Sequence, residues 1–173
     1  MNGAYPVLAG LCLVGLAVRT SYELLKKNGR LDPRNRAIFA VVFGAMSCLL
    51  ASWPVMCPID PARIALPGCL KWIGLGAAVA GWVLAIGGVA QLRGLENIDH
   101  LVTTGLYARL RHPMYSGFIL WIVGWVLTFG AMVSLAIGVV GVANILYWRW
   151  LEDGALRSQY GEAYRSYCQR TWF

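Results

Sequence analysis

The sequence predicts an all-α integral membrane protein with five transmembrane helices and a C-terminal amphipathic helix on the cytoplasmic side. Hydrophobic residues make up 58% of the 173 residues and charged residues only 13%, against roughly 25% charged in soluble domains. Apolar runs near the roughly 20 residues needed to cross a bilayer recur along the chain. Basic residues gather in alternate connections between these runs. We expect one domain over residues 1–173, with its cofactor-binding part at about 91–167.

The net charge of +7 is interpreted as membrane topology and lipid contact, not as a nucleic-acid surface. A soluble basic protein is excluded because no soluble surface could hide these apolar runs. The lipid bilayer is therefore an expected partner, and nucleic acid is not.

The first apolar segment runs from about Tyr5 to Leu25, and Tyr22 with Lys26-Lys27 marks its interface end. No charge precedes it, and it has no clear small-x-small cleavage site. We therefore predict a membrane helix here rather than a cleavable signal. A basic, turn-rich loop follows at 28–36.

Two further spans are predicted before the polar centre of the chain. The second runs from about Ala37 to Met56 and places Trp53-Pro54 in an aromatic belt. A loop from Cys57 to Pro67 leads to the third span, Leu70 to Gln91, which is rich in glycine and alanine. Small residues allow close helix packing, so this face is predicted to contact another helix.

The last two spans are predicted over about Met114 to Phe129 and Met132 to Trp150. Gly130-Ala131 leaves room only for a tight helical hairpin. Beyond Trp150, apolar and aromatic residues recur at spacings of three and four, which predicts an amphipathic helix on the membrane surface. These residues are Leu156, Tyr160, Tyr164 and Tyr167.

Positive charge predicts the orientation. The connections after spans one and three and the C-terminal tail are rich in Lys and Arg, whereas the Cys57–Pro67 loop has only Arg63. The positive-inside rule then places the N-terminus outside, and the C-terminus and the polar motifs in the cytoplasm. Cys57 and Cys69 bracket the outside loop, and their sequence positions leave a disulfide and two free thiols equally open.

The stretch 105–117 is the densest polar segment between apolar runs. It includes Tyr107, Arg111, His112 and Tyr115 around Pro113. Proline fits the first turn of a helix and disfavours helical backbone before it. His112 should therefore stand at a helix N-terminus, whose free N–H groups and positive dipole suit a carboxylate. A metal site is not expected, because the chain has only two histidines and no clustered partners.

Two motifs recur together in this half of the chain. The first joins Leu101-Val102-Thr103-x-Gly105-x-Tyr107 to Arg111-His112-Pro113-x-Tyr115-x-Gly117, and the second is Glu152-Asp153-x-x-Leu156-x-x-x-Tyr160-Gly161-x-x-Tyr164-x-x-Tyr167. This pair resembles the isoprenylcysteine carboxyl methyltransferase family of integral membrane methyltransferases. The resemblance covers about Gln91 to Tyr167.

The resemblance implies S-adenosylmethionine bound at the cytoplasmic face and a lipophilic, membrane-partitioned acceptor. Its best match is a prenylcysteine-like α-carboxylate that is O-methylated. Carried over residue by residue, the cofactor site comprises Gln91, Asp99, His100, Leu101, Val102, Tyr107, His112, Pro113, Met114, Tyr115 and Glu152. Arg111 and Arg149 are the candidates for catalysis.

The residue types suit this cofactor. His112 and the N–H groups near it can bind a carboxylate, and Glu152 can pair with an ammonium or with ribose hydroxyls. Tyr107 and Tyr115 offer aromatic faces to a sulfonium or an adenine. No Gly-x-Gly-x-x-Gly follows a strand pattern, so a Rossmann site is not supported.

The chain departs from the family pattern at three points, one of which is that the family's Val-Pro after the last tyrosine is missing. Asp153 replaces the second glutamate, and Trp148 stands where the family has a substrate-orienting arginine; Arg149 is one step, about 100 degrees, around the helix. Alternative functions are a phospholipid N- or small-thiol S-methyltransferase. Functions of another class are a nicotinamide-dependent membrane reductase and a non-catalytic membrane protein.

Overall fold

The computed structural model describes residues 3–32, 35–92 and 100–173. These residues form helices and loops, with two isolated bridges and no strand among them. The elements in chain order are α1 (Ala4–Lys27), α2 (Arg36–Met56), η1 (Cys57–Ile59), α3 (Gly68–Leu92), η2 (Gly105–Ala108), α4 (Pro113–Phe129) and α5 (Met132–Arg170).

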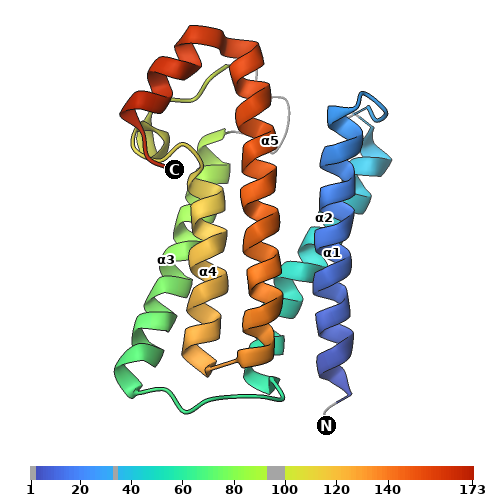
Figure 1. Cartoon of the computed structure of the whole chain (residues 1–173), viewed down its shortest axis with the longest axis vertical. Helices are drawn as coiled ribbons and strands as arrows, with labels where there is room; N and C mark the ends of the chain where they lie inside the picture. Colours follow the sequence, from blue (N-terminus) through green and yellow to red (C-terminus); the bar gives the residue numbers. More distant parts are fainter. Residues whose placement is uncertain (1–2, 33–34, 93–99) are drawn as a thin grey trace.

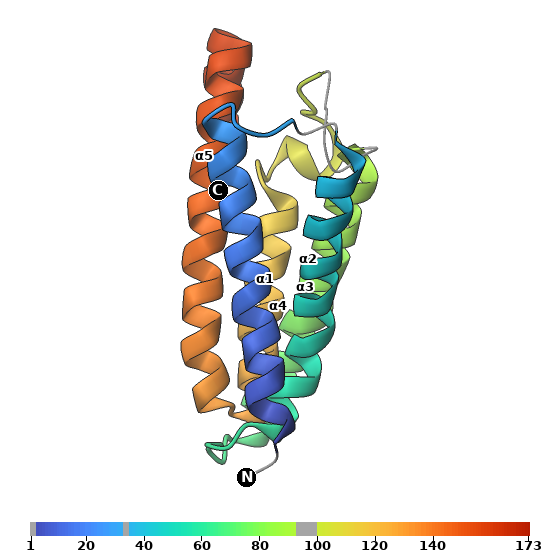
Figure 2. The same ribbon diagram turned by 90° about the vertical axis from the view of Figure 1, so that its right-hand side faces the viewer.

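The long helices run side by side along the long axis of the molecule (Figures 1 and 2). α1 packs on α2, and α3 packs closely on α4. α5 contacts both α4 and α1 and so joins the two pairs. This arrangement leaves the polar motifs at the end of the bundle where α3 ends and α4 begins.

Glycines hold α3 and α4 close together. A Cβ atom added to Gly81 would lie 2.5 Å from the carbonyl oxygen of Gly117, and one added to Gly117 would lie 2.5 Å from that of Gly81. Gly88 faces the start of α4, where an added Cβ would lie 3.0 Å from the nitrogen of Met114. The glycine-rich face of the third helix therefore packs against α4, as the sequence predicts.

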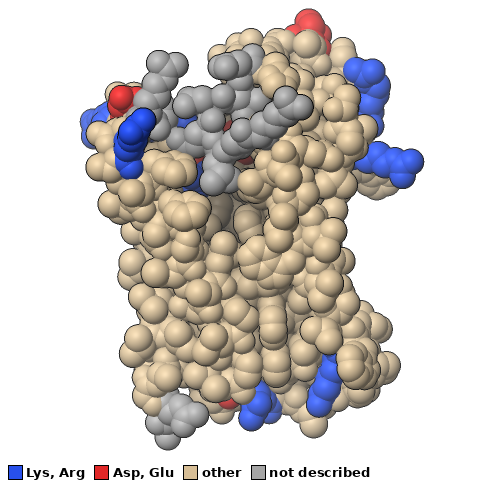
Figure 3. All heavy atoms as spheres, turned by 180° about the vertical axis from the view of Figure 1, so that it is seen from behind, with Lys and Arg blue, Asp and Glu red and all other residues tan. Residues whose placement is uncertain are grey.

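Within the described residues, four helices are long and apolar enough to cross a membrane: α1, α2 with η1, α3 and α5. α4 is apolar but has 17 residues, or about 25 Å of helix, which is short of a roughly 30 Å hydrocarbon core. On the face in Figure 3, charged side chains gather toward the two ends, with an uncharged band between them. This distribution fits a multi-pass membrane protein.

A carboxylate organises the end of the bundle that lies opposite the motifs. Asp60 accepts hydrogen bonds from the backbone nitrogen and hydroxyl of Ser134, both at 2.6 Å, and from Tyr5 at 3.3 Å. Burial raises the pKa of Asp60, but the hydrogen bonds from Ser134 and from the backbone of Ala62 and Val133 outweigh it and leave the pKa below its ordinary value. Asp60 thus ties α1, the loop after η1 and α5 together.

The predicted tight hairpin between the last two helices is confirmed. Gly130 takes a φ of +63°, which only glycine adopts readily, and lets α5 begin two residues later. The loop after η1 is bonded to this turn, from Ile64 N–H to the Gly130 carbonyl at 2.9 Å. Cys57 is buried, Cys69 is exposed, and both are free thiols.

The end of α5 differs from the expected separate surface helix. The helix continues past Trp150 without interruption and breaks at Gly161, with φ +52° and ψ −122°. Beyond this break the chain folds back toward the motif end (Figure 1). Tyr164 and Tyr167 are consequently buried rather than turned to a lipid surface.

Candidate functional site

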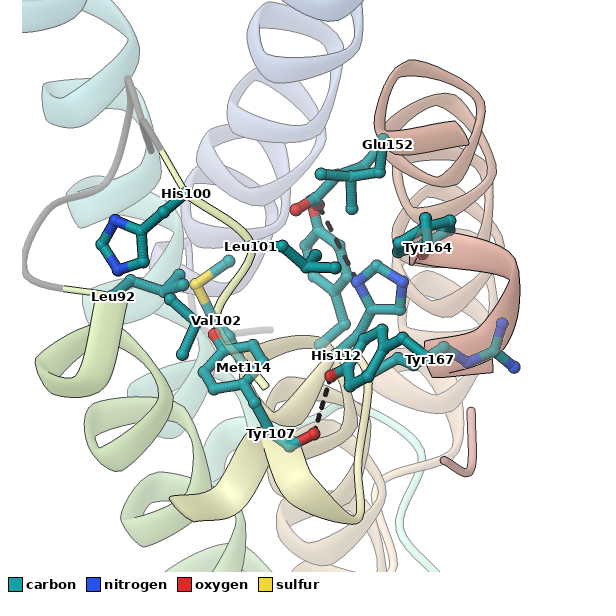
Figure 4. Close-up of a pocket in the computed structure, with 13 residues that line it drawn as sticks. Leu92, His100, Leu101, Val102, Tyr107, His112, Met114, Glu152, Tyr164 and Tyr167 are labelled. Carbon is teal, nitrogen blue, oxygen red and sulfur yellow. Dashed lines mark hydrogen bonds and ion pairs between the residues drawn. The ribbon is translucent and has the colours of Figure 1, made fainter. Parts of the chain in front are cut away.

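The candidate site is a cavity at the motif end of the bundle, between the loop after α3, the start of α4 and the folded-back end of α5 (Figure 4). Its free volume is about 50 Å³. Thirteen residues line it, namely Leu92, His100, Leu101, Val102, Tyr107, Arg111, His112, Met114, Tyr115, Glu152, Leu156, Tyr164 and Tyr167. We call it the motif cavity.

His112 is the polar centre of the motif cavity. It stands just before Pro113, the first residue of α4, with φ −128° and ψ 64°, so the proline sets the start of the helix as predicted. Its side chain is buried, with Nε2 2.8 Å from Oδ1 of Asp153 and Nδ1 4.0 Å from Oε2 of Glu152. The imidazole thus lies between two acids of α5, and Figure 4 shows Glu152 facing it across the cavity.

Asp153 fixes the form of this imidazole. An ionised carboxylate accepts hydrogen bonds only, so Nε2 of His112 carries the proton that it donates. When the ring is neutral, Nδ1 therefore carries no proton, and its lone pair faces Glu152. Asp153 also accepts a hydrogen bond from the Tyr164 hydroxyl, and Nε of Arg149 lies 3.7 Å from its other oxygen.

Two tyrosines join the folded-back end of α5 to η2. The Tyr167 hydroxyl donates to the backbone carbonyl of Tyr107 at 2.7 Å, and the Tyr107 hydroxyl donates to the carbonyl of Gly88 at 3.4 Å. Burial raises the pKa of Tyr107 well above its ordinary value, and the nearby Glu152 and Tyr167 raise it further. Tyr107 therefore stays a neutral hydrogen-bonding group.

The last residues of the chain brace the same loop. The Trp172 N–H donates to the Arg109 carbonyl at 2.8 Å, and the Arg111 N–H donates to the Trp172 carbonyl at 2.9 Å. The guanidinium of Arg149 lies 4.2 Å from the centre of the Phe173 ring. These contacts hold the residues before His112 in a fixed, non-helical path.

The structure brings nine of the residues predicted from the sequence to the motif cavity: His100, Leu101, Val102, Tyr107, Arg111, His112, Met114, Tyr115 and Glu152. Pro113, Gln91 and Arg149 are not among the lining residues. Pro113 is buried as the first residue of α4, and Oε1 of Gln91 accepts the Leu106 N–H at 2.9 Å. Asp99 lies outside the described residues.

Sequence reasoning missed the roles of Asp153 and Tyr164. Asp153 was considered only as a shortened second acid of the motif, and Tyr164 as one residue of a packing face. No signal in the sequence could have shown this contact, because the two residues are eleven apart and meet only where the chain breaks at Gly161.

A second, larger cavity adjoins the first. Its volume is about 430 Å³, and it lies between the α1–α2 pair and the α3–α4 pair. Met114 and Tyr115 line both cavities. We call it the apolar cavity, because its wall is formed mainly by aliphatic and aromatic side chains of α2 and α3, with Arg19 of α1 and Trp148 of α5.

The chain is similar to curated proteins over part of its length. Protein-S-isoprenylcysteine O-methyltransferase of Schizosaccharomyces pombe is 35% identical over 79 residues, which are 42% of this chain and 31% of that protein. Protein-S-isoprenylcysteine O-methyltransferase B of Arabidopsis thaliana is 36% identical over 81 residues, 43% of this chain and 39% of that protein. The chloroplastic 15-cis-zeta-carotene isomerase of Zea mays is 33% identical over 72 residues, 42% of this chain and 20% of that protein.

These matches span about a third of the length of the isoprenylcysteine relatives. No solved structure matches the chain. The family model described as phospholipid methyltransferase matches residues 71–163, which is more than half of the chain and contains the first motif and the second as far as Gly161. The chain therefore belongs to the phospholipid methyltransferase family.

Proposed function

We propose that this protein transfers a methyl group from S-adenosylmethionine to a lipophilic acceptor held in the membrane, with a prenylcysteine-like α-carboxylate as the preferred acceptor. The observation that carries the proposal is the pairing of the two cavities. The motif cavity, which holds the polar side chains of His112 and Glu152, lies beside the apolar cavity, and Met114 and Tyr115 belong to both walls. A water-soluble donor and a lipid-like acceptor could meet there.

The groups that line the motif cavity fit this cofactor. Its carboxylate needs donors, and the buried Nε of Arg111 has no hydrogen-bond partner among the described residues. Its ammonium and ribose need acceptors, which Glu152 supplies from a position on the cavity wall. The volume of about 50 Å³ is below the roughly 300 Å³ of a small-molecule pocket, so binding of a nucleoside would require the lining side chains to move apart.

When bound, S-adenosylmethionine would supply an electrophilic methyl group. An acceptor carboxylate already carries the electron pair for the new O–C bond, so no residue of the chain has to remove a proton. The electron pair of the broken methyl–sulfur bond would stay with sulfur, so the other product would be S-adenosylhomocysteine. The work of the chain is then to position both partners and to exclude water.

The roles of the residues follow from their contacts. His112, held by Asp153, and Glu152 would bind the amino-acid part of the cofactor, and Tyr107 and Tyr115 would present aromatic faces. Arg111 would neutralise a carboxylate at the cavity wall. Arg149 lies against Asp153 and Phe173, so we propose that it positions Asp153; a direct contact with the acceptor stays a prediction.

We further propose that α4 crosses the membrane with the four longer helices. Five spans place the N-terminus outside and the motif cavity in the cytoplasm, where S-adenosylmethionine is available. The support is the charge distribution, with Lys26, Lys27 and Arg30 at the motif end of α1. Reporter fusions at the two termini test this, since an even number of spans would place both on one side.

The activity can be tested on the purified protein with methyl-labelled S-adenosylmethionine and three acceptors. N-acetyl-S-farnesylcysteine offers a carboxylate, phosphatidylethanolamine an amine, and dodecanethiol a thiol. We expect base-labile label on the first. Label only on the second or third would assign an N- or S-methyltransferase. Label on none of them would contradict the proposal.

A further inference from the structure

The apolar cavity holds one charged side chain deep in the bundle. Among the described residues that line it, Arg19 alone carries a formal charge. Arg19 lies eight residues before the end of α1 at Lys27, about 12 Å along the helix. An ionisable group at such a depth in a membrane helix is costly to bury and marks a functional site by default.

The side chain of Arg19 is held in place from three sides. Its guanidinium lies 5.3 Å from the ring centre of Tyr22 and 5.9 Å from that of Trp148. Nη2 pairs with Oε1 of Glu23 at 2.5 Å. Glu23 is not part of the described cavity wall. Of this ion pair, the positively charged Arg19 is therefore the residue that lines the cavity.

Arg19 shares its cavity with the residues that separate it from the proposed cofactor site. Tyr115 and Met114 line the apolar cavity together with Arg19, and they also line the motif cavity beside His112. A molecule bound in the apolar cavity can therefore contact Arg19 and at the same time extend one of its ends to the motif cavity.

We propose that Arg19 binds the anionic group of the acceptor while the acceptor's hydrocarbon chain fills the apolar cavity. This inference rests on the proposed methyl transfer and names the residue that selects the substrate class. A guanidinium has five N–H donors in a planar fork and can hold a carboxylate while it stays paired with Glu23. It disfavours an amine head group, which would bring a second positive charge to the same place.

The shape of the cavity fits an amphiphile. Its volume of about 430 Å³ is within the range of small-molecule pockets, roughly 300–1,000 Å³. On its α2 and α3 sides, Phe43 is 54% exposed and Ile86 61% exposed. These apolar side chains face outward where lipid surrounds a membrane protein, so a hydrocarbon chain can enter from the bilayer.

The test compares two probes that differ only in charge, N-acetyl-S-farnesylcysteine and its neutral carboxamide. Calorimetric titration of the detergent-purified full chain gives both dissociation constants. We expect the wild type to bind the anion at least about tenfold more tightly, because a charge-assisted hydrogen bond distinguishes the probes. Arg19→Met should reduce this ratio to about one, and Arg19→Lys should give an intermediate ratio.

Glu23→Gln separates acceptor binding from a purely structural ion pair. If Arg19 served only to pair with Glu23, this variant would disturb the protein as much as Arg19→Met. If Arg19 binds the acceptor, Glu23→Gln keeps or increases the preference for the anion. In this variant the Arg19 guanidinium no longer has the Glu23 carboxylate competing for it. Arg30→Met, in the exposed loop after α1, is the matched control and should bind both probes as the wild type does.

The outcomes are distinct. An unchanged preference in Arg19→Met, no preference in the wild type, or no binding of either probe would each overturn the assignment of Arg19. Titration with S-adenosylhomocysteine, run on every variant, tests the fold and the proposed function separately. An anion preference that depends on Arg19 in a protein that does not bind S-adenosylhomocysteine would leave Arg19 as an anion site and reject methyl transfer.

Discussion

His112 and Asp153 form a buried pair, with Nε2 of the imidazole 2.8 Å from Oδ1 of the carboxylate. Their positions are 41 residues apart, in the residue before α4 and in the extension of α5. The pair joins the two sequence motifs into one site and sets which ring nitrogen carries the proton. Most of the predictions below depend on it.

Asp153→Asn should weaken cofactor binding although its side chain contacts no proposed ligand. An amide cannot stabilise the imidazole as a carboxylate does, and it can donate to Nε2 and reverse the tautomer. We expect the affinity for S-adenosylhomocysteine to fall about 10- to 100-fold. Glu162→Gln, on the exposed part of α5, is the control and should bind normally. Wild-type affinity in Asp153→Asn would show that His112 needs no partner.

Tyr164→Phe should produce a smaller effect. It removes the hydroxyl that donates to Asp153 but keeps the aromatic ring and the carboxylate. The loss of one hydrogen bond to a charged group, about 1.5–3 kcal/mol, should lower the free energy of unfolding more than it lowers affinity. Thermal unfolding followed by tryptophan fluorescence measures it, with Tyr147→Phe as a matched control. Equal unfolding temperatures for both variants would contradict the role given to Tyr164.

Glycine at 81 should be required for the contact between α3 and α4. In Gly81→Ala the new methyl group would meet the backbone of Gly117, which cannot move aside as a side chain can. We expect a loss of about 1–3 kcal/mol in stability. Gly76→Ala, on the same helix with nothing within 4 Å of the added atom, should be neutral or stabilising by about 0.5–1 kcal/mol. Similar effects at the two positions would refute this packing.

Asp60→Asn should destabilise the end of the bundle opposite the motifs. The carboxylate accepts several hydrogen bonds that hold its pKa below the ordinary 3.8. Because the folded pKa is the lower one, the stabilisation is present above about pH 3.8 and is lost as pH falls through the folded value. The unfolding temperatures of the wild type and the variant, measured from pH 3 to pH 7, should therefore differ at pH 7 and converge toward pH 3. A constant difference at all pH values would contradict this assignment.

Local rules predicted most of the helices. Apolar runs, Pro113 at a helix start and Gly130-Ala131 at a hairpin gave boundaries within a few residues of the structure, except at the end of α5, which continues to Arg170. The glycine face of α3 was predicted to pack on another helix, but its partner was not specified. Small residues show that a close approach exists, and only the topology shows that α4 makes it.

Contacts made across the chain could not be predicted in the same way. The break at Gly161 depends on this one residue adopting a φ of +52°. In an unbroken helix, tyrosines at helical spacing would form an ordinary packing face, which is what the sequence predicted. Arg19 was not singled out either: Glu23 lies one turn along the same helix, but Trp148 reaches Arg19 only when α1 meets α5. The motif residues were predicted from a pattern, whereas Asp153 required knowledge of where His112 lies.

The most direct test of the central claim is a calorimetric titration of wild type and His112→Ala with S-adenosylhomocysteine, with NADPH as a parallel titrant. We predict saturable binding of S-adenosylhomocysteine by the wild type, binding at least about tenfold weaker in His112→Ala, and no binding of NADPH by either protein. The unfolding temperature of the variant checks that it is folded. Equal binding by both proteins would place the cofactor outside the motif cavity, and binding of NADPH alone would replace the methyltransferase with a nicotinamide-dependent reductase.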